Sequence, residues 1–226
     1  MCGRYTLKTP PAELAELFGL GDPPALAPRY NIAPTQPVPA VRSSAGDGRE
    51  WALLRWGLVP GWADDPSVGN RMINARAETV AAKAAFRNAL KNRRCLVAAD
   101  GFYEWKREGR QKQPFHIRLR GGGPFAFAGL WERWTKGGEP LESCTFLTTG
   151  PNELMQPLHD RMPVIIAPED FDLWLDPAVR DAEALAHLLR PFPAERMEAF
   201  PVSKHVNSPT RDDPACAAPL PPAGEG

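Results

Sequence analysis

FHIRLRGGGPFAFAGL, residues 115–130, is the stretch that decides the fold. Two short apolar runs, Phe115–Leu119 and Phe125–Leu130, contain the aromatic and β-branched residues that strands favour. Three glycines, Gly121–Gly123, lie between them and form a turn signal, because glycine adopts backbone angles that other residues avoid. The stretch therefore predicts two strands joined by a hairpin turn.

Further strand-like runs lie on both sides of this stretch. They are short, apolar and bounded by turn residues: Val38–Val41, Trp51–Trp56, Cys95–Ala99, Cys144–Thr148 and Met162–Ile166. Helix patterns flank them, and these cover the segment after Thr9-Pro10-Pro11, then Thr79–Arg94, Pro168–Leu175 and Ala178–Leu189. Strands and helices do not alternate regularly. The pattern predicts an α+β fold, with a mainly antiparallel, barrel-like sheet and flanking helices.

The 226 residues, 43% of them hydrophobic, suffice for one core and one domain. We expect that domain to span residues 1–209, followed by a disordered Pro/Ala-rich tail at 210–226. The sequence has no apolar run long enough to span a membrane and no apolar signal core at its start. We therefore expect a cytoplasmic, monomeric protein.

The cysteines and histidines do not form a recognisable metal motif. None of the four cysteines belongs to a CxxC pair, and the four histidines lie far apart in the sequence. An intracellular chain would keep these thiols reduced. We expect neither a metal ion nor a cofactor.

Charge is balanced over the whole chain but not along it. Residues 29–120 carry 17 of the 27 Lys and Arg residues and 8 of the 27 Asp and Glu residues. Twenty of the basic residues are Arg, which binds phosphate through two hydrogen bonds at once. This distribution fits a local nucleic-acid groove, and it fits equally well a simple bias in composition.

Cys2 is the first candidate for chemistry. Methionine aminopeptidase removes Met1 when residue 2 is small, which leaves an α-amine and a thiol on one residue. Their reference pKa values are about 8 and 8.5, so both groups are partly reactive at neutral pH. With an aldehyde, such an aminothiol forms a Schiff base and then a five-membered thiazolidine. Gly3 and Arg4 offer space and positive charge, which favours an accessible Cys2, although a buried or incidental cysteine fits the same three residues.

Three polar motifs are further candidates. Asn74 can hold an amine or thiol, and Arg76 can bind a phosphate, although both also suit an ordinary helix entry. Glu104 lies among aromatic residues, where desolvation raises a carboxyl pKa toward the range of a general acid, but it also fits a rim carboxylate paired with Lys106. His159 precedes an apolar strand beside charged residues, a position suited to proton transfer.

Six segments, in order along the chain, resemble the SRAP family, the SOS response-associated peptidases or abasic-site processing proteins. These segments are MCGRY (1–5), RYNIAPTQ (29–36), RWGLVPGW (55–62), INARAET (73–79), ADGFYEW (99–105) and LHDRMPVI (158–165). The resemblance extends from residue 2 to about residue 209. It implies a DNA-repair enzyme that bonds covalently to abasic sites in single-stranded DNA, with the peptidase name reflecting self-removal of Met1.

The resemblance also implies a role for each catalytic candidate. Cys2 would form the thiazolidine with the ring-opened deoxyribose, and Asn74 would orient the Cys2 amine. Glu104 would transfer protons during sugar-ring opening and crosslink reversal. His159 would assist Schiff-base formation and the associated lyase-type strand cleavage.

DNA-binding roles follow from the same resemblance. Phosphate contacts are implied for Arg76, Thr148 and Arg161. A wedge that separates bases beside the lesion is implied for Pro34 and Trp62, with the polar residue Asn31 near it. The family often has a second Trp after Trp62, whereas this chain has Ala63, which predicts a thinner wedge.

Two other classes remain as alternatives. Glutaminase domains of amidotransferases also begin Met-Cys-Gly and use the cysteine as nucleophile, but that class leaves ADGFYEW and LHDRMP without a role. A non-catalytic single-strand binder would share the Arg- and Trp-rich stretch and would need neither Cys2, Glu104 nor His159. Covalent trapping of abasic DNA distinguishes these classes.

Overall fold

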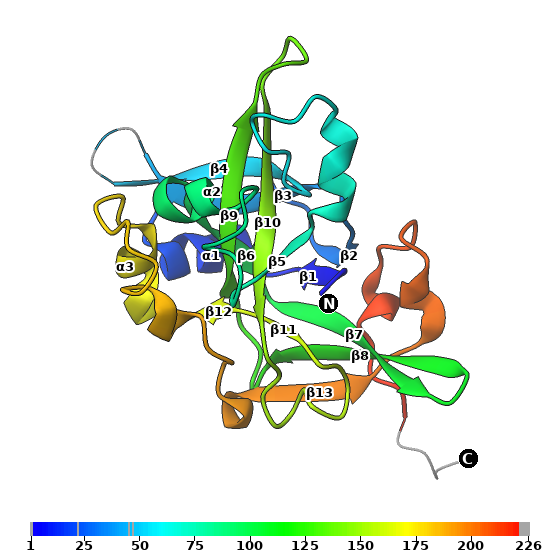
Figure 1. Cartoon of the computed structure of the whole chain (residues 1–226). Coiled ribbons are helices and arrows are strands. Elements are labelled where there is room, and N and C mark those ends of the chain that lie inside the picture. Colours follow the sequence, from blue (N-terminus) through cyan, green and yellow to red (C-terminus); the bar gives the residue numbers. More distant parts are fainter. Residues whose placement is uncertain (1, 22, 45, 47, 222–226) are drawn as a thin grey trace.

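A computed structural model describes residues 2–21, 23–44, 46 and 48–221. Two β-sheets organise this part of the chain (Figure 1). The smaller sheet is antiparallel throughout and has the order β13-β8-β7-β1-β2. Its strands are β1 (Tyr5–Leu7), β2 (Arg29–Ile32), β7 (Gly101–Glu108), β8 (Gln111–Leu119) and β13 (Met197–Pro201).

The larger sheet closes on itself. Strand β10 pairs with both β4 and β9, so β10, β4, β3, β6 and β9 form a ring. Most pairs are antiparallel, and β10 runs parallel to β4 and β5. Its strands are β3 (Pro37–Ser43), β4 (Arg49–Trp56), β5 (Asn74–Arg76), β6 (Arg94–Ala99), β9 (Phe125–Trp134), β10 (Leu141–Thr149), β11 (Met162–Pro163) and β12 (Ile165–Ile166). The expected barrel-like, mainly antiparallel sheet is confirmed.

An aromatic cluster lies in the core between the two sheets. Trp56 and Phe146 stack with ring centroids 4.4 Å apart, and Phe127 stacks on Phe146 at 5.1 Å. Tyr5 of the smaller sheet meets Trp56 edge-on at 5.6 Å. All four side chains are fully buried. These contacts fix β1, and with it the start of the chain, against the barrel.

Three α-helices lie on one side of the barrel (Figure 1): α1 (Pro11–Phe18), α2 (Arg87–Asn92) and α3 (Phe171–Leu175). Helix α1 begins with proline in its first turn and ends at Gly19, whose φ of 60° allows the left-handed cap. Its buried Phe18 stacks on Phe171 of α3 at 5.4 Å. None of the helices in the described ranges has the length and apolar character needed to cross a membrane.

Two expected helices are largely absent. Thr79–Arg94 contains turns followed by the short α2, and Ala178–Leu189 contains turns followed by the 3-10 helix η3 (Ala186–Leu188). Ala81–Ala84 are exposed, so helix propensity there is not supported by a buried face. In the second segment the Asp181 carboxylate accepts a hydrogen bond from the Glu183 amide at 3.0 Å, a contact that competes with a helical turn. The prediction of long helices was wrong at both places.

Two strand predictions also need correction. Gly121–Gly123 all have positive φ, but they do not close a hairpin, because β8 and β9 belong to different sheets. The expected strand Met162–Ile166 is divided at Val164: β11 pairs with β10 and β12 pairs with β9. The helix expected over Pro168–Leu175 is confirmed, with the 3-10 turn η2 (Pro168–Asp170) leading into α3.

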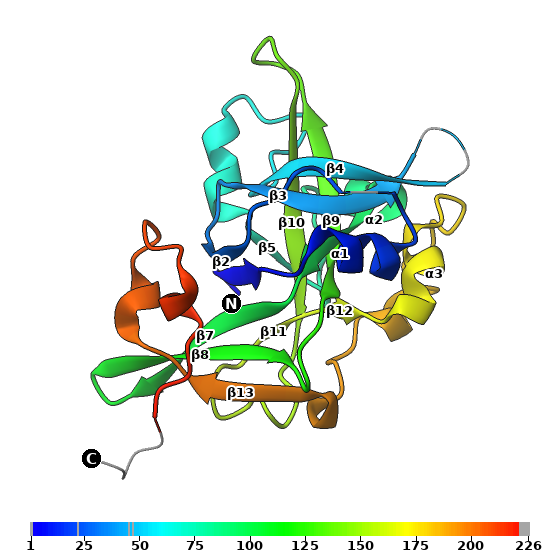
Figure 2. The same cartoon turned by 180° about the vertical axis from the view of Figure 1, so that it is seen from behind.

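Residues 210–221 are not the disordered tail that we expected. They contain the 3-10 helix η6 (Pro214–Cys216), and Pro219 forms a β-bridge with Val202. Cys216 is fully buried. Figure 2 shows the red and orange C-terminal segment lying beside β7, β8 and the start of the chain. Residues 222–226 of the expected tail lie outside the described residues. The remaining 3-10 helices are η1 (Pro66–Arg71), η4 (Ala194–Arg196) and η5 (Lys204–Asn207).

Candidate active site

Cys2 lies in the interior, just before β1. Its relative exposure is 0%, and its Sγ lies 3.8 Å from the carbonyl oxygen of Arg4, to which it donates. Burial raises the pKa of the Cys2 thiol, and the nearby Glu104 carboxylate raises it further. The thiol is therefore neutral in this conformation. Cys2 is not accessible and the alternative of a buried residue holds, because β1 pairs with β2 and β7 and Cys2 belongs to the same buried core as Tyr5.

Asn74 contacts Cys2 directly. Asn74 begins β5, which runs parallel to β10 and places Asn74 opposite Phe146. Its Nδ2 donates to the Cys2 carbonyl oxygen at 2.8 Å, a contact with the backbone rather than with the amine that we expected. The buried Asn74 Oδ1 has no hydrogen-bond partner within the described ranges. An acceptor is thus available beside Cys2.

Glu104 is the carboxylate of this interior. It comes from β7, the neighbour of β1, and is 2% exposed. Burial raises the Glu104 pKa above its ordinary value, and the charge of His159 lowers it in part. A carboxyl group with a raised pKa holds its proton nearer to neutral pH, which suits a general acid.

His159 lies at the edge of the same group. Its Nε2 is 3.9 Å from Glu104 Oε2, and its side chain is 27% exposed. The Arg161 backbone N–H donates to His159 Nδ1 at 3.0 Å, so a neutral ring carries its proton on Nε2, which faces Glu104. Asp160 Oδ1 lies 3.0 Å from the same Nδ1 and would accept its proton in the charged form. His159 thus connects the buried carboxyl group with solvent.

Arg161 has an acidic partner that we did not expect from the sequence. Its NH1 and NH2 donate to the two carboxylate oxygens of Glu78 at 2.7 and 2.9 Å. NH2 also donates to the carbonyl oxygen of Thr148 at 2.5 Å. Thr148 is fully buried in β10, opposite Arg76 of β5. Glu78 lies two residues after Arg76 in the motif INARAET, and that acidic neighbour was the signal available in the sequence.

The comparisons with known proteins agree with this geometry. The family model described as SOS response associated peptidase (SRAP) matches residues 1–209. The chain belongs to the SRAP family.

Similar proteins span nearly the same length. The abasic site processing protein YoqW of Bacillus subtilis (strain 168) is 45% identical over 219 residues, covering 95% of this chain and 97% of YoqW. The abasic site processing protein YedK of Escherichia coli (strain K12) is 32% identical over 215 residues, covering 92% and 95%. A crystal structure of a protein from Bacteroides thetaiotaomicron has a TM-score of 0.86 and 28% identity, covering 97% of this chain and all of that one.

In this SRAP protein the wedge candidates occupy different surroundings. Trp62 is 60% exposed and Pro34 is half-buried. Asn31 is fully buried, and its Nδ2 donates to the carbonyl oxygens of Ser208 and Arg211 at 2.9 and 2.7 Å. Asn31 therefore holds the C-terminal segment in this conformation and is not exposed for a contact with DNA.

The SRAP fold thus brings some of the predicted residues together and not others. Cys2, Asn74, Glu104 and His159 come from distant parts of the chain and meet within one interior region, through the contacts given above. Arg161 and Thr148 touch each other at its border. Arg76 is exposed at the end of β5. Arg4, which we expected only to supply positive charge beside Cys2, donates to Asn31 Oδ1 at 3.1 Å and to the carbonyl oxygen of Val206 at 2.9 Å, and so links the residues near Cys2 to the C-terminal segment.

Proposed function

We propose that this protein bonds covalently to abasic sites in single-stranded DNA through Cys2, after Met1 has been removed. The observation that carries the proposal is the convergence of Asn74, Glu104 and His159 on an N-terminal cysteine. The relatives named abasic site processing proteins support the same substrate. SRAP membership also favours this chemistry over that of an amidotransferase.

Glu104 begins the proposed reaction. An abasic deoxyribose is mostly a closed ring, and its aldehyde appears only when the bond between C1′ and the ring oxygen breaks. The protonated Glu104 donates its proton to the ring oxygen, and the resulting carboxylate accepts the proton of the C1′ hydroxyl. The raised pKa keeps that proton available near neutral pH.

Cys2 then forms the crosslink in two steps. Its amine adds to the C1′ aldehyde and one water molecule leaves, which gives a Schiff base. The thiol sulfur attacks the imine carbon, and the thiol proton moves to the nitrogen, which closes the thiazolidine. The imine and the thiazolidine are isomers of equal mass, so an experiment must distinguish them by whether the adduct survives denaturation.

Asn74 and His159 assist these steps. We propose that the Asn74 Oδ1 accepts a hydrogen bond from the free Cys2 amine, while Nδ2 holds the Cys2 carbonyl. His159 relays protons between Glu104 and solvent during Schiff-base formation. A base that removes the C2′ proton of the Schiff base would expel the 3′ phosphate, and this is the lyase-type reaction.

Single-stranded DNA is the substrate that the surface fits best. Arg76 and Arg161 supply phosphate contacts, and the exposed Trp62 supplies a stacking surface. Neither phosphate contacts nor stacking depends on hydrogen bonds to the edges of the bases. An unpaired strand that lacks a base also spares the cost of extruding one. We propose a cytoplasmic protein that is nucleoid-associated when bound to DNA.

Removal of Met1 is required, because a nitrogen in a peptide bond cannot form a Schiff base. We propose that the chain removes Met1 itself, using the Cys2 thiol. Intact mass spectrometry of the native chain and of Cys2→Ala tests this proposal, with both chains made by cell-free translation that lacks methionine aminopeptidase. Retention of Met1 in the variant, with its loss in the native chain, is the expected result. Retention of Met1 in both chains would assign the step to the cell.

A borohydride experiment tests the proposed crosslink. The native protein is mixed with a single strand that carries one abasic site, with and without reductant, and then denatured. We expect equal adduct in both samples, because a thiazolidine does not need reduction to survive. An adduct that appears only with borohydride would show that the reaction stops at the imine.

A further inference from the structure

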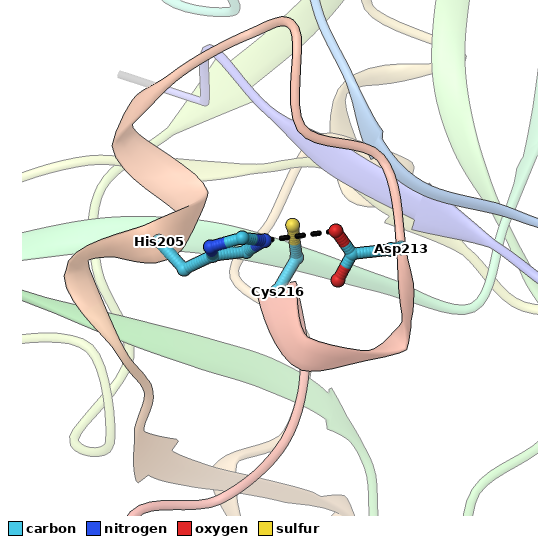
Figure 3. Close-up of side chains that lie close together, drawn as sticks. All are labelled: His205, Asp213 and Cys216. Carbon is cyan, nitrogen blue, oxygen red and sulfur yellow. Dashed lines mark hydrogen bonds and ion pairs between the residues drawn. The ribbon is translucent and has the colours of Figure 1, made fainter.

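Three side chains with metal-binding atoms meet on the C-terminal segment, away from the site described above. His205 lies in η5, Asp213 precedes η6, and Cys216 ends η6. One donor atom from each residue lies within 4.8 Å of the other two. Figure 3 shows the imidazole, carboxylate and thiol facing a common point. The spacing along the chain did not reveal this group, because the fold of the segment creates it.

We propose that His205, Asp213 and Cys216 bind one Zn²⁺ ion, or a similar transition-metal ion. Imidazole nitrogen and thiolate sulfur favour zinc over magnesium or calcium, which prefer sets of oxygen ligands. Zinc is usually tetrahedral in proteins, so water would occupy the fourth position. This site is independent of the reaction at Cys2.

The geometry is close to that of a bound ion. Tetrahedral zinc with ordinary bond lengths holds its ligand atoms roughly 3.3–3.8 Å apart. His205 Nε2 and Asp213 Oδ2 are 2.8 Å apart and share a hydrogen bond, so these two atoms must move slightly apart to bind an ion. Asp213 Oδ1 accepts from the Ala215 amide at 2.9 Å, which orients the carboxylate and leaves Oδ2 for the metal. Small side-chain rotations complete the site.

The charges also suit a divalent ion. The Cys216 Sγ donates to the Arg211 carbonyl oxygen at 3.4 Å. A coordinated thiol loses its proton, so metal binding releases that proton to solvent. The thiolate and the Asp213 carboxylate then balance the two positive charges of the ion.

Arg211 opposes metal binding in this conformation. Its NH1 donates to His205 Nδ1 at 2.7 Å, so Nδ1 is an acceptor and Nε2 carries the ring proton. Coordination through Nε2 requires the proton to move to Nδ1, and Arg211 must then turn away. Arg211 is exposed, so its side chain can move into water. Removal of Arg211 should therefore strengthen metal binding.

Metal binding would stabilise the segment that packs on β2. Asn31 already holds this segment through the carbonyl oxygens of Ser208 and Arg211, which lie between the metal-binding residues in sequence. An ion at His205, Asp213 and Cys216 would add a second fixed point. Its role would be to stabilise this segment, because an ion that binds only the folded site adds its binding free energy to the stability of the fold.

Cobalt titration tests the proposal with the full chain. The Cys2→Ala background is used, because a free amine and thiol on Cys2 would themselves bind metal. We expect one equivalent of Co²⁺ to give a sulfur-to-cobalt charge-transfer absorption, and native mass spectrometry to show one Zn²⁺. Cys216→Ser should abolish the absorption, and Arg211→Gln should tighten Zn²⁺ binding about tenfold. His187→Gln, at an exposed histidine in η3, is the matched control.

Several results would overturn the proposal. No charge-transfer absorption in the Cys2→Ala chain would do so, as would the same absorption after Cys216→Ser. Cys216 is buried, and if its variant does not fold, His205→Gln and Asp213→Asn decide instead, because both residues are partly exposed. Unchanged Co²⁺ affinity in those two variants would exclude the site. Weaker Zn²⁺ binding after Arg211→Gln would contradict the assigned role of Arg211.

Discussion

Cys2 is fully buried, although the proposed reaction requires its amine and thiol to reach a sugar. Its neighbours keep the thiol neutral until it attacks, because burial and Glu104 both raise its pKa. A neutral, buried thiol reacts poorly with other electrophiles in the cell. The reactive aldehyde must therefore be delivered to the interior, and DNA binding is the step that delivers it.

Cys2→Ser separates the two covalent steps. Serine keeps the α-amine but has a much weaker nucleophile for ring closure, so the reaction should stop at the Schiff base. We expect an adduct that survives denaturation only after borohydride reduction. Intact mass must first establish that Met1 is absent from the variant. An adduct of Cys2→Ser that is stable without reductant would refute the thiazolidine step.

The variant Glu104→Gln tests the role of Glu104 in crosslinking and, separately, the effect of its burial on stability. The neutral amide cannot transfer protons, and we expect the rate of crosslinking to fall about 100-fold or more.

Because burial raises the Glu104 pKa in the folded state, the native protein should lose stability relative to the variant as pH rises from about 4 toward 8. Urea denaturation at both pH values measures this difference. A stability difference independent of pH would contradict the assigned burial effect.

Among the single elements, the parallel strand β5 positions two of the proposed site residues. It places Asn74 against Cys2 at one end and Arg76 beside Thr148 at the other. One short strand therefore holds a proposed catalytic residue and a proposed DNA-binding residue. Glu78, just beyond it, binds Arg161 with both carboxylate oxygens and so occupies the guanidinium that we propose for a phosphate contact.

Glu78→Gln should tighten binding to single-stranded DNA. The native carboxylate competes with phosphate for Arg161, and its removal frees that guanidinium. We expect about fivefold higher affinity for an undamaged strand at low salt, a gain of about 1 kcal/mol. Fluorescence anisotropy measures it, with Glu139→Gln as a control that removes an exposed charge elsewhere. Weaker binding by Glu78→Gln would instead mean that Glu78 orients Arg161 for DNA.

Local sequence predicted the elements that depend on local patterns. The strands β3, β4, β6, β9 and β10 and the helix α1 were found from apolar runs, proline and glycine. The features that local patterns did not predict depend on contacts with residues distant in sequence. The split between β11 and β12 depends on which of β10 and β9 each strand meets, and α2 is short because Ala81–Ala84 have nothing to pack against. The burial of Cys2 likewise depends on β7, which is about a hundred residues away.

At the scale of the whole molecule, the C-terminal segment joins the smaller sheet to the start of the chain. Asp212 accepts from the backbone amides of Tyr30 and Asn31 at 2.6 and 2.8 Å and pairs with Arg29. Arg4 donates to the carbonyl oxygen of Val206 at 2.9 Å. The family model ends at residue 209, but these contacts extend beyond it.

A chain that ends at residue 209 should therefore be less stable. It loses the Asp212 acceptor for two backbone amides and the buried Cys216. We expect Tm to fall by about 5–10 °C, from unsatisfied amides costing about 1–3 kcal/mol each. A chain that ends at residue 221 keeps every contact described above and is the control. Equal Tm values for the two chains would show that the segment does not stabilise the fold.

Covalent capture through Cys2 is tested most simply by a denaturing gel of the untagged protein, mixed with single-stranded DNA that carries one abasic site. Mass spectrometry first verifies that Met1 is absent. We expect a heat-stable band of protein joined to DNA, which is lost with Cys2→Ala and with DNA that has no abasic site. No such band from the native protein, or an equally stable band from Cys2→Ala, would contradict covalent capture through Cys2.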